Sequence, residues 1–153
     1  MLSAGEKAPE FTLLNENAEN VALTNFAGKK VLVYFYPKAS TPGCTVQANG
    51  LNDVLDTLTE HNVVVLGISI DAPKRLINFK TKQGLNFTLL SDEDHAVCEA
   101  FGVWQLKKFM GKEYMGIVRT SFLINESGVV EKVFDKFKTK DHHEVVLQYL
   151  KSA

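Results

Sequence analysis

The stretch from Val31 to Leu58 constrains the fold of this chain more than any other. It begins with six consecutive apolar residues, Val31 to Tyr36, most of them β-branched or aromatic, which is typical of a strand buried on both faces. Pro37 and the run from Ser40 to Gly43 then interrupt the strand. After Cys44 the apolar residues recur at helical spacing, at Leu51, Val54, Leu55 and Leu58. The pattern predicts a buried strand, a turn and a helix, with a cysteine where the helix begins.

Cys44 is the first candidate for chemistry. A cysteine at the start of a helix lies near free backbone N–H groups and the positive end of the helix dipole, and both favour the reactive thiolate. The alternative is that Cys44 is a small buried hydrophobe, as most lone cysteines are. The rigid turn around Pro37 and Pro42, with the Thr41 hydroxyl one turn before the sulfur, favours a redox nucleophile.

The rest of the chain alternates strands and helices. Strands are predicted at 11–14, 21–23, 31–36, 63–70, 87–90, 117–124 and 129–134; helices are predicted after Cys44, from 73 to 83, around Cys98 and after Asp141. Residues 103–116 are predicted to be a loop followed by a turn. This order indicates an α/β protein with a central mixed sheet, helices on both faces and an N-terminal β-hairpin extension. The arrangement matches a thioredoxin-like fold.

Composition narrows the class of protein. A length of 153 residues suits one domain, residues 1–153. Because 17 basic residues are balanced by 18 acidic ones, nucleic acid is not an expected partner. No apolar run is long enough for a membrane span and the start lacks the apolar core of a signal peptide, so we expect a cytoplasmic protein. Two cysteines, Cys44 and Cys98, predict thiol chemistry rather than a disulfide scaffold or a metal site, and no cofactor is expected.

Arg119 is the second candidate. It falls inside the predicted strand 117–124, whose alternation places it in a sheet covered on both faces. A buried guanidinium needs a partner, and a cysteine thiolate would serve, although sequence spacing does not show that the two groups meet. The alternative is a charge on an edge strand or a solvent-facing surface. The adjacent His142 and His143 are expected to be solvated at a helix start rather than to bind a metal.

Two motifs around Cys44 resemble a known family. The segment Pro37 to Cys44 fits the active-site pattern P-x-x-x-T-x-x-C of the peroxiredoxins. Its form T-P-G-C-T-x-Q, from Thr41 to Gln47, is similar to the bacterioferritin comigratory protein, or peroxiredoxin Q, subfamily. The resemblance extends along nearly the whole chain, through the segments GISIDAPKRL, NFTLLSDEDHAVCEAFGVW, GIVRTSFLI and FDKFKTKDHH.

This resemblance implies a thiol-dependent peroxidase that reduces hydrogen peroxide and organic hydroperoxides. Cys44 would be the peroxidatic cysteine that becomes a sulfenic acid. Thr41 would hydrogen-bond the peroxide, and Arg119 would stabilise both the thiolate and the transition state. Pro37 would shield the site from water, and Gln47 would orient the arginine.

The chain departs from the subfamily pattern at one position. Many members carry a resolving cysteine five positions after the peroxidatic one, where this chain has Asn49, and the predicted helix 73–83 also has none. Three explanations remain open. An external thiol reduces Cys44 directly, Cys98 resolves it after local unfolding, or residue 49 is a substitution. We expect the one-cysteine route, because Cys98 is interpreted as a small buried hydrophobe in an apolar helix.

The resemblance favours thioredoxin as the thiol donor, with glutaredoxin or glutathione as alternatives, and a monomer. Two rival functions also fit a thioredoxin-like fold. A thiol–disulfide oxidoreductase normally has the motif C-x-x-C, but the first of these four positions is Thr41 here. A non-catalytic binding module would leave Cys44 unreactive and Arg119 without a role.

Overall fold

The computed structural model describes residues 1–153 and contains one large mixed sheet. Its strands are β1 (Thr12–Asn15), β2 (Asn20–Ala22), β3 (Lys30–Phe35), β4 (Val63–Ser69), β5 (Thr88–Ser91), β8 (Thr120–Ile124) and β9 (Val130–Phe134). Their order across the sheet is β2-β1-β5-β4-β3-β8-β9. β3, β4 and β5 are parallel, and the strands at both edges are antiparallel to their inner neighbours.

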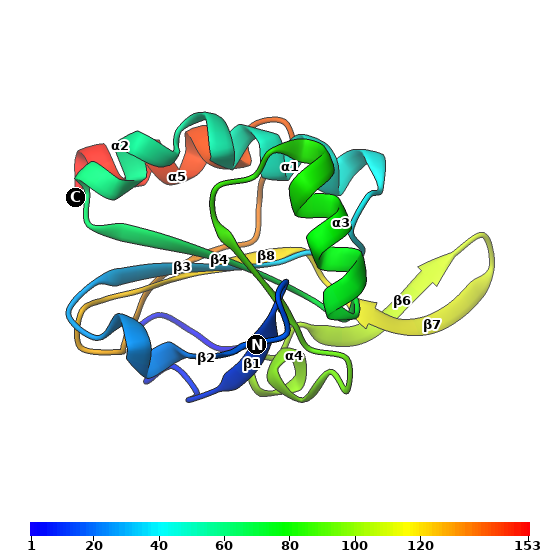
Figure 1. Ribbon diagram of the computed structural model, residues 1–153. Helices are drawn as coiled ribbons and strands as arrows, with labels where there is room; N and C mark the ends of the chain where they lie inside the picture. Colours follow the sequence, from blue (N-terminus) through cyan, green and yellow to red (C-terminus); the bar gives the residue numbers. More distant parts are fainter.

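Helices cover both faces of this sheet, unequally (Figure 1). They are α1 (Pro42–Asp53), α2 (Leu55–Glu60), α3 (Pro73–Gln83), α4 (Ala96–Ala100) and α5 (His142–Ser152), with a short 3-10 helix, η1 (Leu23–Phe26). The core on one face receives side chains from α1, α2, α3 and α5, and the core on the other face is closed by α4, η1 and the N-terminal segment. No helix is both long and apolar enough to cross a lipid bilayer.

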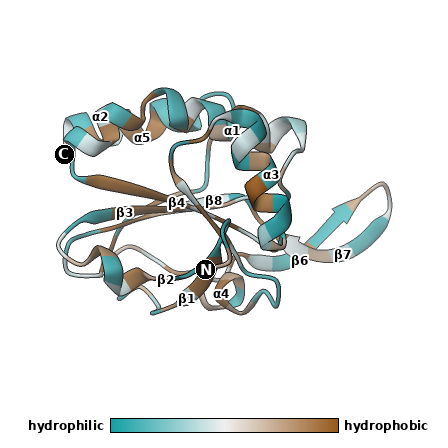
Figure 2. Cartoon of the chain, viewed as in Figure 1, coloured by the Kyte–Doolittle hydropathy of each residue, from teal (hydrophilic) through white to brown (hydrophobic).

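The central strands separate these two cores because their side chains alternate. In β3, Leu32 and Tyr34 belong to the core under α1, whereas Val33 and Phe35 belong to the core over α4. Figure 2 shows the result, with hydrophobic colour concentrated on the central strands and hydrophilic colour on the outer faces of the helices. The apolar runs at 31–36 and 63–70 therefore predicted two strands buried on both faces correctly.

The predicted N-terminal hairpin is present. β1 and β2 pair antiparallel, with Thr12 opposite Ala22, and β1 adds to the sheet beside β5. The turn between them carries Glu16, whose buried carboxylate forms an ion pair with Lys80 on α3. This ion pair joins the hairpin to the helical layer.

Residues 103–116 were predicted wrongly as a loop and a turn. They form most of a second, separate hairpin, β6 (Trp104–Phe109) and β7 (Lys112–Ile117), joined at Met110 and Gly111, which both have positive φ. This hairpin projects beyond the body of the molecule (Figure 1). Because most of its side chains face solvent on both sides, the sequence lacks the alternation of a half-buried strand.

The predicted strand 117–124 is interrupted. β7 ends at Ile117 and β8 begins at Thr120, so Val118 and Arg119 lie between two strands of different sheets. The Val118 N–H donates to the carbonyl oxygen of Val103, 2.8 Å away, instead of joining the ladder of the large sheet. Arg119 is therefore not a strand residue.

The helix after Cys44 is divided at Val54, whose φ of −108° and ψ of 13° are not helical. Gly50, a weak helix former, has a packing role in the first part. A Cβ at this position would lie 2.4 Å from Nδ1 of His143, so only glycine lets α1 and α5 approach this closely.

Candidate active site

Cys44 is the third residue of α1, which begins at the edge where β3 ends. Its side chain is buried, with 2% exposure. Pro42 occupies the first position of the helix and has no N–H, and the backbone N–H groups of Gly43 and Cys44 have no acceptor within the chain. These free donors and the helix dipole surround the sulfur with positive potential, as the sequence predicted.

Arg119 reaches Cys44 from a position 75 residues away in the sequence. Its Nη1 and Nη2 each donate a hydrogen bond to Cys44 Sγ at 3.4 Å. A guanidinium in this place puts a positive charge and two hydrogen-bond donors beside the sulfur. The structure thus brings together two residues whose meeting the sequence spacing left open, and Arg119 comes from the break between β7 and β8 and not from a strand.

Gln47 completes this arrangement. It lies one turn after Cys44 on α1, is fully buried, and its Oε1 accepts a hydrogen bond from Arg119 Nη1 at 2.6 Å. The guanidinium is thus held between a carbonyl oxygen and the sulfur. The Gln47 Nε2 has no partner within the chain.

Thr41 and Pro37 lie in the loop between β3 and α1. Thr41 is the N-terminal cap of α1, and its hydroxyl donates to the Lys38 carbonyl oxygen at 2.8 Å. Because the hydroxyl proton is used there, the Thr41 oxygen is left as an acceptor. Pro37 is half-buried and lies two residues after the end of β3.

Asp71 holds this loop in place and was not singled out from the sequence. Its buried carboxylate accepts from the backbone N–H of Ala39 at 2.8 Å, from the Ser69 hydroxyl at 2.8 Å and from Arg75 Nε at 3.1 Å. The next loop residue, Ser40, has a φ of 66°, a conformation that is unfavourable for a non-glycine residue. Its position in the topology could have identified it. Asp71 follows β4, and neighbouring parallel strands such as β3 and β4 have their carboxyl ends at the same edge of the sheet.

His142 is not solvated, contrary to the prediction. It has no exposed surface, and its Nε2 lies 2.7 Å from Ser121 Oγ on β8. Burial, with help from the charges of His143 and Arg119, lowers the pKa of His142 to about 3. His143 is also mostly covered, because it packs against Gly50. The amphipathic spacing of α5 placed Val146 and Leu150 in the core but gave no sign that a histidine would join them.

The segment before α5 also reaches the site. A Cβ at Gly43 would lie 3.6 Å from Arg119 Nη2 and 3.6 Å from Thr139 Cγ2, so the guanidinium and Thr139 both line this helix start. Nothing in the sequence pattern identified Thr139. No group of three or more His, Cys, Asp or Glu side chains is arranged to bind a metal ion.

Cys98 and Asn49 bear on recycling. Cys98 is fully buried on α4 and belongs to the core on the opposite face of the sheet from Cys44. Burial raises the pKa of the Cys98 thiol, and the nearby Asp92 carboxylate raises it further. Both cysteines are free thiols. Asn49 Nδ2 donates to Gln83 Oε1 at 3.2 Å and so links α1 to α3.

Comparisons with known proteins identify the relatives of this chain. Residues 4–133 match the model of the AhpC/TSA family. The chain is 62% identical to a putative peroxiredoxin bcp of Haemophilus influenzae, with 99% of this chain and 97% of that protein covered. It is 61% identical to peroxiredoxin Bcp of Escherichia coli, with 98% and 96% covered.

Solved structures agree with these relatives. A structure of Xanthomonas campestris peroxiredoxin Q aligns with a TM-score of 0.90 at 37% identity, covering 97% of both chains. A cysteine-to-serine mutant of Xylella fastidiosa PrxQ aligns with a TM-score of 0.93 at 30% identity, covering 99% of this chain and 97% of that one. The predicted thioredoxin-like α/β fold is confirmed.

Proposed function

Because this chain belongs to the AhpC/TSA family, in its Bcp or peroxiredoxin Q subfamily, and is therefore a thiol-dependent peroxidase, we propose that Cys44 is its peroxidatic residue. The substrates are hydrogen peroxide and organic hydroperoxides. The observation that carries this assignment is the pair of 3.4 Å hydrogen bonds from the Arg119 guanidinium to Cys44 Sγ. A buried sulfur paired with a fixed positive charge is an activated nucleophile.

The reaction follows from this geometry. The thiolate attacks one peroxide oxygen, so that an S–O bond forms while the O–O bond breaks. Sulfur gives up two electrons and becomes a sulfenic acid, and the leaving oxygen takes a proton to become water or an alcohol. Arg119 and the free N–H groups of Gly43 and Cys44 stabilise the charge that develops on the oxygens.

Three further residues position the substrate and the guanidinium. Thr41 accepts a hydrogen bond from the peroxide hydroxyl, because its own proton is donated to Lys38. Gln47 fixes the orientation of Arg119. Pro37 limits the access of water at the mouth of the site.

Recycling proceeds by the one-cysteine route in this proposal. An external thiol condenses with the sulfenic acid to give a mixed disulfide and water, and a second thiol then releases the Cys44 thiolate and carries away the disulfide. Support comes from Asn49 at the usual resolving position and from Cys98 on the far side of the sheet. Thioredoxin is the proposed donor, with glutaredoxin or glutathione as alternatives. The enzyme acts as a monomer in the cytoplasm, where both cysteines would stay reduced.

One experiment tests both parts. Peroxide turnover is measured with thioredoxin, with glutaredoxin and with a small thiol, on the native protein and on the variants Cys44→Ser and Cys98→Ser. We expect Cys44→Ser to be inactive and Cys98→Ser to keep full turnover. Activity in Cys44→Ser would refute the role of Cys44, and a 44–98 disulfide in the peroxide-treated monomer, seen by mass spectrometry, would refute the one-cysteine route.

A further inference from the structure

Exposed apolar side chains gather at the edge of the molecule that contains Cys44. Of the nine large hydrophobic side chains that are exposed, five lie on the β6–β7 hairpin: Leu106, Phe109, Met110, Tyr114 and Met115. Two more, Val46 on α1 and Ile70 after β4, lie at the same edge of the sheet. Because paired residues of a hairpin share one face and neighbours along a strand alternate, Leu106 and Met115 lie on the opposite face from Phe109 and Tyr114. We call Phe109, Met110 and Tyr114, together with Val46 and Ile70, the hairpin surface. Such a concentration of exposed apolar side chains is typical of a site where another macromolecule binds.

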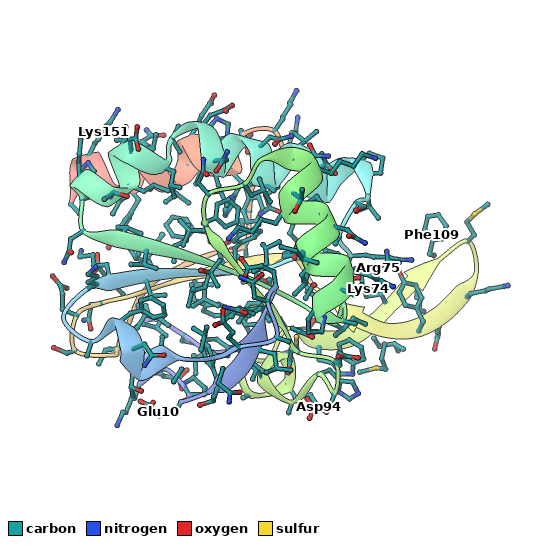
Figure 3. All side chains as sticks on the ribbon, in the orientation of Figure 1. Glu10, Lys74, Arg75, Asp94, Phe109 and Lys151 are labelled. Atoms are coloured by element: carbon teal, nitrogen blue, oxygen red, sulfur yellow. The ribbon has the colours of Figure 1, made fainter.

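The hairpin is attached directly to the catalytic pair. At its base, Trp104 pairs with the buried Ile117, and two residues later the chain reaches Arg119. Lys107 Nζ donates to the Ile117 carbonyl oxygen at 2.8 Å, and burial together with the nearby Arg119 lowers the pKa of Lys107. The distal part stands free, with the labelled Phe109 projecting into solvent (Figure 3). A partner that covers the hairpin from its tip to its base would therefore reach the residues beside Cys44.

This edge is positively charged. Exposed cations include Lys108 and Lys112 on the hairpin, Lys38 in the loop before α1, and Lys74 and Arg75 at the start of α3. Figure 3 shows Lys74 and Arg75 at the end of α3 that faces the hairpin. Of these five cations only two form ion pairs: Lys108 with Glu113 at 3.5 Å, and Arg75 with the buried Asp71. The whole chain has a net charge of −1, so the positive charge of this edge differs from the slightly negative charge of the molecule as a whole.

The reduction of the sulfenic acid indicates which kind of partner binds at this edge. On the proposed one-cysteine route no thiol of this chain lies near the sulfenic acid, so a partner must bring its own thiol to Cys44, which is only 2% exposed. The partner must therefore cover this edge closely. A second copy of this chain in a two-fold contact would present the same cations to themselves and be repelled.

We propose that the hairpin surface is the docking site for a protein dithiol reductant whose reactive cysteine is surrounded by apolar and acidic side chains. Phe109, Met110 and Tyr114 supply the apolar contact, and the surrounding lysines attract the acidic rim of the partner. This proposal rests on the proposed function, because it concerns the second half of the same cycle.

The test compares turnover with a protein reductant and turnover with a small thiol. Turnover is measured for the native protein, for Phe109→Ser/Met110→Ser and for Lys108→Glu/Lys112→Glu, first with thioredoxin, thioredoxin reductase and NADPH, then with dithiothreitol. We expect each double variant to raise the KM for thioredoxin at least ~10-fold, in line with the loss of a binding hot spot. The rates with dithiothreitol and of sulfenic acid formation should not change. Leu14→Ser, at an exposed apolar position on β1, is the matched control and should match the native protein.

The outcomes are distinct. If Cys44 of the native protein forms no sulfenic acid, the proposed function fails and the docking proposal falls with it. If the sulfenic acid forms but the KM for thioredoxin is the same in all variants, only the docking proposal is overturned. A native dimer in sedimentation velocity that Phe109→Ser/Met110→Ser dissociates would assign the surface to a second copy and also overturn it.

Discussion

Arg119 owes its position beside Cys44 to the short break between β7 and β8. Inside a central strand, the hydrogen bonds to the neighbouring strands fix the direction of each side chain. Val118 and Arg119 instead connect the two sheets and form no strand pairing in the large sheet. The guanidinium can then lie against the first turn of α1, where both Nη atoms contact Cys44 Sγ. Gln47 holds it there through its Oε1. The Arg119 side chain thereby brings its positive charge to the sulfur at the start of α1.

Replacing Gln47 with methionine tests this orientation. Methionine has a similar volume but lacks the carbonyl oxygen that accepts from Arg119, and a hydrogen bond to a charged group contributes about 1.5–3 kcal/mol. We expect kcat/KM for hydrogen peroxide to fall about 10–100-fold. Gln47→Glu keeps an acceptor and should retain more activity than Gln47→Met in stopped-flow oxidation of Cys44. Equal losses in the two variants would contradict an orienting role.

His142 predicts a pH dependence of stability. Its pKa is about 3 in the folded protein, below the value of about 6.5 for a free histidine. Between these two pH values the unfolded state binds more protons than the folded one, so acidification lowers the free energy of unfolding. The contribution of this residue is at most about 1.4 kcal/mol per pH unit below pH 6.5, and none is lost above that pH.

Urea denaturation at pH 7, 6 and 5 measures this effect. His142→Gln removes the titrating ring and keeps a group that can hydrogen-bond Ser121. We expect the variant to lose less stability than the native protein over this range. Parallel losses in the two proteins would show that other groups cause the acid sensitivity.

At the scale of elements, the site depends on four of them meeting at one edge of the sheet. β3 leads into the loop before α1. β4 ends beside it at Ser69, and Asp71 follows before α3 begins. The Asp71 carboxylate bonds the Ala39 N–H of the first loop and Arg75 of α3. It therefore fixes the loop that holds Ser40 in its strained conformation and places Thr41 at the helix start.

Asp71→Asn tests this anchoring. The amide keeps the shape but loses the charge, so we expect a destabilisation of about 1–3 kcal/mol and a roughly 10-fold lower kcat/KM for peroxide. Amide hydrogen exchange across residues 37–44 should become faster. Asp92→Asn is the matched control, because Asp92 is also a buried carboxylate and accepts from the N–H groups of Val97 and Cys98 on the other face of the sheet. A similar loss of peroxide activity in Asp92→Asn would contradict the specific role of Asp71.

At the scale of the whole molecule, one sheet separates two apolar cores. Cys44 lies in the core under α1, and Cys98 lies in the core closed by α4. Any disulfide between them would require the sheet or a helix to open, because Cα atoms must come within about 7 Å. Both cores share the central strands, so neither half can lose its packing without affecting the other.

This sharing predicts one cooperative folding unit for residues 1–153. We expect a single transition in calorimetry, with equal van't Hoff and calorimetric enthalpies. The projecting β6–β7 hairpin makes few contacts with either core and should exchange its amide protons faster than β3 or β4. Two separate transitions would contradict the prediction of one domain.

The sequence by itself determined the succession of the large-sheet strands and long helices along the chain, the thioredoxin-like fold, and Cys44 at a helix start. These features follow from local periodicity, because buried strands and amphipathic helices must show their apolar faces in the sequence. The motif around Thr41 and Cys44 also gave the family. The exposed β6–β7 hairpin was missed because it buries too little to leave such a pattern.

The tertiary structure alone decided how distant residues meet. The contact of Arg119 with Cys44 depends on a break in a strand, and the burial of His142 depends on how the start of α5 packs against β8 at Ser121. The bond from Ala39 to Asp71 depends on two parallel strands ending together. These contacts join residues many positions apart and are set by packing, which local periodicity does not encode.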